Sequence, residues 1–227
     1  MNVENLMRSA KAPVMSAGKL ATSAFVVTNT ATAAAALGWM FSEWAMRGKP
    51  TVLGAASGAV AGLVAITPAS GYVTPLASII IGAVAGFLCY NACNVKTKLG
   101  YDDSLDVVGV HGVGGTWGAL ATGLFATKAI NPDASDGLFS GNPGQMGAQI
   151  VAIVASWVLA FFGTLIILKI LDATMGLRVP EEDEVAGLDL SQHSETAYAL
   201  ESPGYGVTGG GAFSEAMKPP AKPTTAG

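Results

Sequence analysis

Long runs of apolar residues, separated by short polar or glycine-rich breaks, make up most of the sequence. No Asp, Glu, Lys, Arg or His occurs between residues 50 and 95, a stretch long enough for two membrane spans of about 20 residues each. The segment TPASGY at residues 67–72 divides this stretch, because Pro, Ser and Gly together interrupt a helix. The pattern predicts five apolar segments, at approximately residues 22–46, 53–67, 73–95, 105–127 and 148–171.

These segments are predicted to be transmembrane helices. In lipid, every backbone N–H and C=O group must be paired inside the protein, so only helices and closed barrels span a membrane. Barrel strands alternate apolar and polar residues, and the sequence shows no such alternation. We therefore expect an all-α integral membrane protein with about five transmembrane helices, the second of which is short for a span.

Glycine recurs at four-residue spacing inside three of the segments. This spacing places small residues on one helix face and lets two helix backbones approach closely, which stabilises helix association in lipid. The repetition predicts a tightly packed bundle in which these glycines form the contacts: Gly54, Gly58 and Gly62; Gly82 and Gly86; Gly114 and Gly118.

Composition supports the membrane prediction and argues against several other classes of protein. The chain is 51% hydrophobic and 12% charged, whereas soluble domains carry about 25% charged residues. A net charge of −4 without basic patches argues against nucleic-acid binding. The nucleotide-binding, metallohydrolase and serine-hydrolase motifs of soluble enzymes are absent from the sequence. We therefore expect no enzyme activity, cofactor or metal site.

Charge and composition divide the chain into four regions. An N-terminal segment (1–20) precedes a helical bundle (21–172), an acidic tail segment (173–200) and a tail rich in Gly, Pro, Thr and Ala (201–227) that we expect to be disordered. Lys and Arg near span ends favour the cytoplasmic side, and more of them share the side of the C-terminus than the opposite side. This favours a multi-pass cell-membrane protein with a cytoplasmic C-terminus.

One histidine, His111, lies within an apolar segment. Ionisable residues inside a membrane are costly, so they mark a transport pathway or a polar partner. Neutral imidazole has one donor and one acceptor nitrogen and titrates near neutral pH, which suits an uncharged polar substrate or a proton relay. The alternative is that His111 only hydrogen-bonds a neighbouring helix.

Aspartates precede His111 near the predicted start of its helix. Carboxylates in a first turn stabilise the helix N-terminus, so capping is the alternative to a functional role for Asp102, Asp103 and Asp106. Asp103 lies eight residues before His111, about 12 Å along a helix axis, so the two side chains are not expected to touch.

The cysteines and tryptophans have simpler interpretations. Cys89 and Cys93 share one helix face, and we interpret them as small buried apolar residues because no His or carboxylate accompanies them. Tryptophan suits membrane interfaces and helix contacts, which we expect for Trp39, Trp44, Trp117 and Trp157.

Three segments together carry a resemblance to a known family. The sequence resembles the C-terminal half of ammonium transporters of the Amt/Rh family from about Ser16 to Tyr198. The segments that carry the resemblance are GKPTVLGAASGAVAGLVAITPASGYV (48–73), DVVGVHGVGGTWGALATGLFA (106–126) and GLRVPEEDEVAGLDLSQHSETAY (176–198).

The resemblance implies a fold and a transport pathway. Family members have eleven membrane helices, the first ten forming two inverted repeats, and the five segments here would be helices seven to eleven. Each subunit of a trimer holds a narrow apolar pore, where ammonium is deprotonated and ammonia passes two facing histidines. His111 matches the second histidine, Asp103 matches an aspartate at the cytosolic start of its helix, and Thr67 and Ser57 match polar positions of helix eight.

The resemblance also implies a regulatory tail. In the family this tail packs on the neighbouring subunit, and a signal-transducing regulatory protein docks on the cytosolic face of many members. The expected partners are therefore ammonium or ammonia, the lipid bilayer, further copies of this chain or a complete transporter, and such a regulatory protein. The matching tail residues are Arg178, Pro180, Glu181, Gly187, His193 and Tyr198.

The sequence contains no counterpart of the family's first six helices. We therefore expect an incomplete pore in one copy, because a pore between two inverted halves needs both. The missing half would come from a second chain or from upstream sequence. The alternatives are a non-conducting relative that assembles with and regulates a complete ammonium transporter, a truncated product without function, and an unrelated membrane enzyme that uses His111 and the aspartates.

Overall fold

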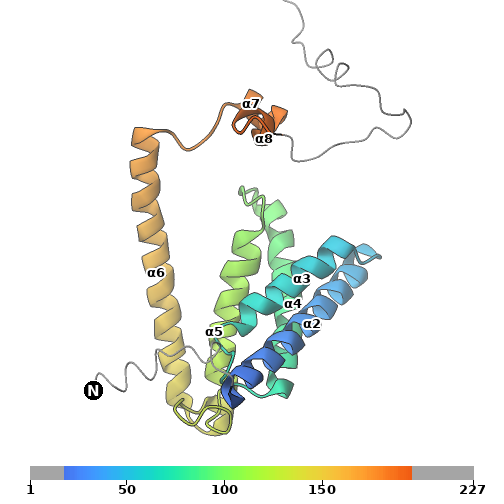
Figure 1. Cartoon of the computed structure of the whole chain (residues 1–227), viewed down its shortest axis with the longest axis vertical. Coiled ribbons are helices and arrows are strands. Elements are labelled where there is room, and N and C mark those ends of the chain that lie inside the picture. The colour runs from blue at the N-terminus through green and yellow to red at the C-terminus, as the bar shows by residue number, and fades with distance from the viewer. Residues whose placement is uncertain (1–17, 196–227) are drawn as a thin grey trace, which may run out of the picture. The chain divides into compact units, whose positions relative to one another are not determined.

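The computed structural model describes residues 18–195, and the regular elements of this range are all helical. The chain divides between Leu165 and Ile166 into two compact units, each of which is described by itself. In chain order the elements (Figure 1) are α2 (Lys19–Arg47), α3 (Val52–Ile66), α4 (Pro75–Leu99), the π-helical turn η2 (Val108–Gly112), α5 (Val113–Phe125), the 3-10 turn η3 (Leu138–Ser140), α6 (Pro143–Thr174), α7 (Glu181–Ala186) and α8 (Leu188–Ser191).

Each predicted apolar segment contains a helix, but the helices differ in length. Within residues 18–195, three are long and apolar enough to cross a membrane: α2, residues Pro75–Lys96 of α4, and α6. Helix α3 has 15 residues and is therefore about 22 Å long, whereas the hydrocarbon core of a bilayer is roughly 30 Å thick. The predicted segment of α3 is thus shorter than a full span, whereas η2 and α5 form one uninterrupted helical stretch from Val108 to Phe125.

Local sequence sets where the helices begin and end. Helix α4 begins after Thr74, whose hydroxyl accepts a hydrogen bond from the backbone N–H of Ala77 at 3.3 Å, and Pro75 occupies its first position. It ends at Gly100, whose φ of 68° favours glycine. The predicted break at residues 67–72 is present as a series of turns between α3 and α4.

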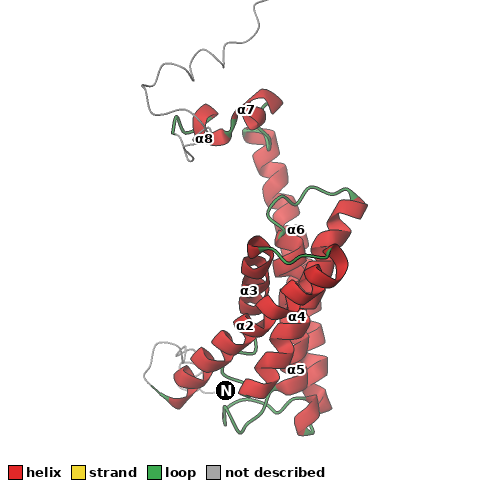
Figure 2. Cartoon of the chain, turned by 90° about the vertical axis from the view of Figure 1, so that its right-hand side faces the viewer, coloured by secondary structure: helices red, strands yellow, loops and turns green. Residues whose placement is uncertain are grey.

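Helices α2, α3 and α4 lie beside one another (Figure 2), and contacts between small residues hold them together. Ala31 and Ala35 of α2 are fully buried. A Cβ atom on Gly86 of α4 would overlap the Ala35 carbonyl oxygen, and one on Gly62 of α3 would lie 2.7 Å from the Ala31 carbonyl oxygen. The predicted glycine motifs therefore do form helix contacts, and α2 uses the same two alanines against both neighbours.

Helix α5 packs on α3 and α4. A Cβ atom on Gly118 would overlap the carbonyl oxygen of Ala65 in α3. Trp117 donates its indole N–H to the Ile81 carbonyl of α4 at 2.9 Å, which confirms the expected helix contact for this tryptophan. The buried residues of this bundle are small and apolar: Val27, Ala31, Ala65, Ile66, Ala69, Val73, Ala77, Ile81, Ala85 and Ala121.

A buried glutamate, Glu43, joins α2 to α3. It is only 3% exposed, and its carboxylate accepts hydrogen bonds from the backbone N–H and the hydroxyl of Thr51 at 3.0 and 3.1 Å. Because Thr51 is the N-cap of α3, the carboxylate lies at the positive end of that helix. Gly54 leaves the necessary room, since a Cβ atom there would overlap a carboxylate oxygen.

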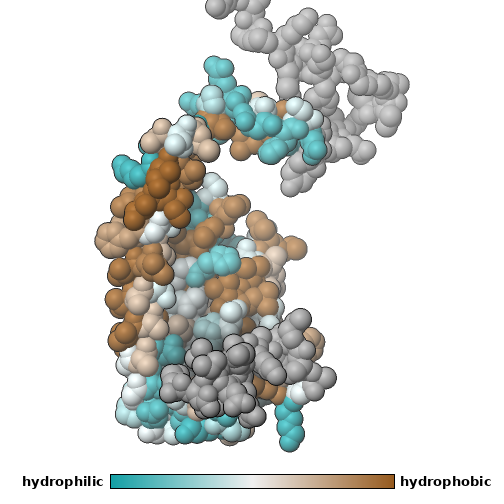
Figure 3. Space-filling model, turned by 60° about the vertical axis from the view of Figure 1, so that its left-hand side comes forward, coloured by the Kyte–Doolittle hydropathy of each residue, from teal (hydrophilic) through white to brown (hydrophobic). Residues whose placement is uncertain are grey.

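Helix α6 is apolar around its whole circumference. It has 32 residues, none of them buried in the described structure, and Figure 3 shows hydrophobic side chains covering it. A helix that is apolar on every side needs lipid or other protein surfaces around it. Its length and composition therefore agree with the membrane location predicted for residues 148–171.

The second unit contains the acidic tail segment. Arg178 pairs with Glu184 at 3.2 Å, and the Gln192 side chain donates to the Asp183 carboxylate at 3.0 Å, which connects α7 with the end of α8. The predicted disordered tail (201–227), Tyr198 and most of the predicted N-terminal segment (1–20) lie outside the described residues.

The glycine contacts predict a position-specific effect of adding one methyl group. Gly86→Ala should lower the stability of the bundle by roughly 1–3 kcal/mol, because the methyl group forces α2 and α4 apart. The matched control is Gly163→Ala in α6, where a Cβ atom meets nothing within 4 Å. It should leave stability unchanged or raise it, because alanine favours helix more than glycine does. Thermal unfolding in detergent, followed by circular dichroism, measures both. Equal effects of the two variants would contradict the close contact.

Candidate functional site

The π-helical turn η2 has a packed side and an open side. Gly109 and Val110 are buried. The Cys89 thiol lies 3.7 Å from the Val110 carbonyl oxygen, and a Cβ atom on Gly109 would lie 2.6 Å from the sulfur of Cys93. The two cysteines therefore pack against this turn. Cys89 is buried, as expected, whereas Cys93 is only partly buried and lies within hydrogen-bonding distance of the Asp106 carboxylate, a neighbour that the sequence did not lead us to expect. π-helical turns are rare and frequently occur at functional sites.

His111 lies on the open side of η2. It is exposed, as are Val107 and Val108, which are each 50% exposed. Its imidazole is thus presented next to apolar side chains, on a face that the other described helices leave uncovered. Among residues 18–195, no hydrogen bond joins His111 to a neighbouring helix.

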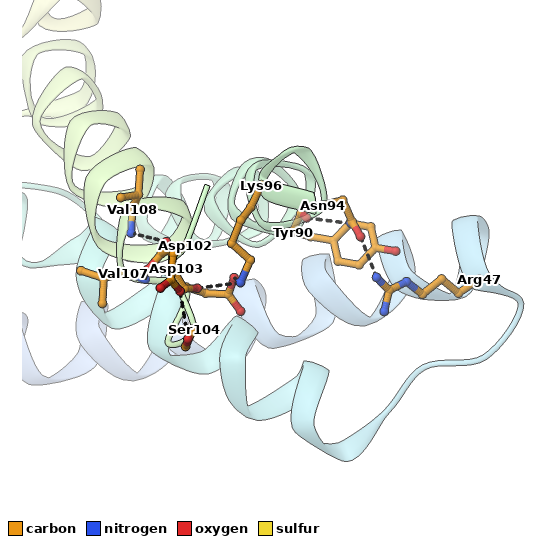
Figure 4. A network of polar contacts seen from close by, with 10 residues as sticks. Arg47, Tyr90, Asn94, Lys96, Asp102, Asp103, Ser104, Val107 and Val108 are labelled. Carbon is orange, nitrogen blue, oxygen red and sulfur yellow. Dashed lines mark hydrogen bonds and ion pairs between the residues drawn. The ribbon is translucent and has the colours of Figure 1, made fainter. Parts of the chain in front are cut away.

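Asp103 caps the start of the helix that carries His111. One carboxylate oxygen accepts the backbone N–H of Val107 at 2.8 Å and the other accepts that of Val108 at 2.9 Å (Figure 4). Both bonds are charge-assisted and satisfy amides that have no partner within the helix. Asp103 thus fixes the first turn, and its carboxylate is not in contact with His111.

Asp106 is held by a lysine that sequence reasoning treated only as a topology signal. Its backbone is left-handed, with φ at 55°, a conformation that Asp tolerates better than most residues. Its carboxylate pairs with the Lys96 ammonium group at 2.5 Å, and Lys96 also donates to the Asp103 carbonyl at 2.7 Å. Lys96 therefore ties the loop before η2 to the end of α4.

A second polar contact joins α2 to α4 at the same end of the bundle. Arg47 donates to the side-chain oxygen of Asn94 at 2.7 Å, and Asn94 donates to the Tyr90 carbonyl at 2.9 Å (Figure 4). The Arg47 guanidinium also lies 5.9 Å from the centre of the Tyr90 ring, within the range of a cation–π contact. Basic side chains of α2 and α4 therefore gather at the end where η2 begins.

The other two predicted pore residues lie on α3. Ser57 is partly buried in the second turn of α3, whereas Thr67 is exposed immediately after the last turn, so the helix separates them. The Thr67 hydroxyl donates to the Leu63 carbonyl at 2.6 Å. Helix α3 packs against η2, the turn that carries His111. Ser57 and Thr67 do not form one cluster with His111.

The predicted tail residues lie in and around α7 and α8. Arg178 forms the ion pair with Glu184, Pro180 is the N-cap of α7, and Glu181 is its first residue. Gly187, with φ at 95°, connects α7 to α8. His193 follows α8 and is exposed.

Sequence reasoning missed two residues that organise this end of the bundle. Lys96 entered the sequence analysis only as one of the basic residues that indicate the cytoplasmic side. The loop between α4 and η2 is nevertheless short enough to bring Asp103 and Asp106 back to it. Glu43 was not singled out, because nothing in the sequence shows that its partner Thr51 begins the next helix.

The sequence profile of the Ammonium Transporter Family matches residues 10–198, most of the chain. The chain belongs to this family. An ammonium transporter of Bacillus subtilis is 54% identical to it over 176 residues, which are 77% of this chain and 44% of the relative. The ammonium transporter Amt1 of Archaeoglobus fulgidus is 47% identical over 184 residues, which are 81% of this chain and 46% of Amt1.

Solved structures show the same fold. The crystal structure of Saccharomyces cerevisiae Mep2 superposes with a TM-score of 0.68 at 34% identity, over 72% of this chain and 38% of Mep2. A Sensor Amt Protein superposes with a TM-score of 0.64 at 28% identity, over 76% of this chain and 42% of that protein. The chain thus spans less than half the length of the relatives it matches. With its apolar helices, family membership makes it a multi-pass membrane protein.

The capping geometry predicts that Asp103 stabilises the helix start. Asp103→Ala should lower stability by roughly 0.5–2 kcal/mol and speed amide hydrogen exchange at Val107 and Val108, because both amides lose their acceptor. Asp133→Ala, in an exposed loop, is the matched control. Hydrogen exchange read by mass spectrometry on peptides covering residues 103–112 measures the effect. Unchanged exchange in Asp103→Ala would refute the capping role.

Proposed function

We propose that this chain supplies part of a pore that carries ammonium across a membrane as ammonia, with His111 on the pore wall. Family membership and the relatives named ammonium transporters support the substrate. The observation that carries the proposal for the site is the exposed His111 on a π-helical turn between apolar side chains.

The chemistry favours the neutral form of the substrate. An isolated ion in an apolar environment is far more costly than a neutral polar molecule, for which the penalty without hydrogen bonds is about 2–7 kcal/mol. A neutral imidazole offers one acceptor and one donor, so His111 offsets part of the lost hydration as ammonia passes. With one nitrogen that accepts and one that donates, the ring also suits the transfer of the proton left behind.

The pore in this proposal requires a second set of helices. The face that carries His111 is uncovered in the described structure, and the chain covers 44% of the length of the Bacillus subtilis relative. Further helices, from additional sequence or from another chain, would cover this face and enclose the pathway. Asp103 would hold the helix beneath His111 in place, and Ser57 and Thr67 would add polar groups along α3.

The distribution of basic residues supports a cytoplasmic C-terminus. Arg47 and Lys96 lie at one end of the bundle, where their side chains bind Asn94 and Asp106, and Lys49 and Lys98 flank the same helix ends. Positively charged residues next to membrane spans favour the cytoplasmic side. This end is therefore proposed to face the cytoplasm.

The tail is proposed to bind protein surfaces on that side. Helix α7 carries acidic residues at its first four positions, while Val185 is 82% exposed. Exposed apolar residues beside acidic ones suit docking on a neighbouring subunit of a homotrimer or on a signal-transducing regulatory protein. The structural similarity to a Sensor Amt Protein supports a regulatory partner.

Uptake of methylammonium tests the pore role of His111. The chain is co-expressed with the N-terminal helices of the Bacillus subtilis relative in cells that lack their own ammonium transporters. His111→Ala should lower uptake about ten- to a hundredfold, because it removes a hydrogen-bonding group that the enclosed pore of this proposal would bury, worth roughly 1–3 kcal/mol. Asp133→Ala, at equal membrane abundance, should retain uptake.

Two other outcomes have distinct meanings. Uptake by His111→Ala at the level of the unaltered chain would reject the pore role. A chain that shows no uptake in this assay, but co-purifies with a complete transporter and lowers its uptake, would instead support the non-conducting regulator.

A further inference from the structure

Trp157 lies away from the position that tryptophan normally takes in a membrane helix. Interfacial belts are the usual location, whereas Trp157 lies near the middle of α6, which runs from Pro143 to Thr174. An indole N–H in hydrocarbon needs an acceptor, because no water is available there. Trp157 finds one on α5, where it donates to the Thr116 hydroxyl oxygen at 3.0 Å.

The Thr116 hydroxyl continues this contact to the turn that carries His111. A hydroxyl has one proton to donate, and that of Thr116 goes to the Gly112 carbonyl at 2.7 Å. Gly112 is the last residue of η2 and directly follows His111. The order of donation is therefore Trp157 to Thr116 to Gly112, and hydrogen bonds in such a chain strengthen one another.

The chain of hydrogen bonds acts where the helix geometry changes. A π-helical turn contains one more residue than the α-helix around it, and the return to α-helix occurs at Val113, the first residue of α5. A carbonyl held at Gly112 fixes the backbone at this transition. The orientation in which His111 leaves the helix depends on that backbone.

We propose that Trp157 and Thr116 are positioning residues for His111, and that α6 sets the orientation of the imidazole through them. Neither side chain contacts the substrate in this proposal. Helix α6 is uncovered in the described structure, so whatever surrounds it in the membrane acts on His111 through Trp157. The effect of these residues on transport rests on the proposed function, whereas the hydrogen-bonded link from Trp157 through Thr116 to the turn of His111 does not.

Nuclear magnetic resonance of the histidine rings tests the link directly. The full chain is labelled with ¹⁵N-histidine and studied in lipid nanodiscs, and loss of a signal in His111→Ala assigns that signal to His111. Trp157→Phe keeps the aromatic ring but removes the donor, so the ring signals of His111 should shift. Trp44→Phe is the matched control, since Trp44 and Trp157 are both 57% exposed, and it should leave the His111 signals in place.

Variants of Thr116 distinguish positioning from a general loss of packing. Thr116→Val removes the hydroxyl at nearly constant shape and should shift the His111 signals as Trp157→Phe does. Thr116→Ser restores the hydroxyl and should restore the original signals. The double variant Trp157→Phe/Thr116→Val should shift them no further than Thr116→Val alone.

The outcomes that overturn the link are equally definite. Unchanged His111 signals in both Trp157→Phe and Thr116→Val would reject it, as would shifts that add in the double variant. If the signals respond as expected while His111→Ala leaves uptake unaltered, the link stands and the proposed pore role of His111 fails.

Discussion

The approach of α2 to its neighbours through Ala31 and Ala35 is the contact on which the rest of the bundle depends. No hydrophobic driving force brings helices together in lipid, so their association relies on close van der Waals packing between backbones. Glycines on α3 and α4 supply that closeness on two sides of the same helix. Once α3 and α4 are fixed against α2, they form the surface on which α5 and its π-helical turn pack.

This arrangement gives the π-helical turn η2 one buried side and one exposed side. Gly109 and Val110 are buried against α4, while His111 remains on the other side. Polar contacts from Asp103 and Lys96 hold the start of the turn. The fold thus places the polar contacts of Asp103 and Lys96 at the helix ends and leaves the His111 imidazole within the apolar length, where an ionisable side chain is costly.

Much of this could be predicted from the sequence, because apolar runs and glycine spacing report directly on membrane helices and their contacts. The break at residues 67–72 and the packing of Gly86 and Gly118 are examples. The π-helical turn could not be predicted, since one extra residue in a helix leaves no mark on composition. The partnership of Lys96 with Asp106 was also hidden, because it depends on a loop residue with a left-handed backbone.

The buried carboxylate of Glu43 makes α2 and α3 dependent on each other. Helix α3 is too short to gain much from crossing the bilayer alone, and the first amides of α3 rely on a capping threonine that is held by Glu43 of the preceding helix. Neither the charge nor the helix end is satisfied until both segments are present. The two helices therefore depend on each other, because separating them would take from the Glu43 carboxylate and from the start of α3 the partners that each has in this hairpin.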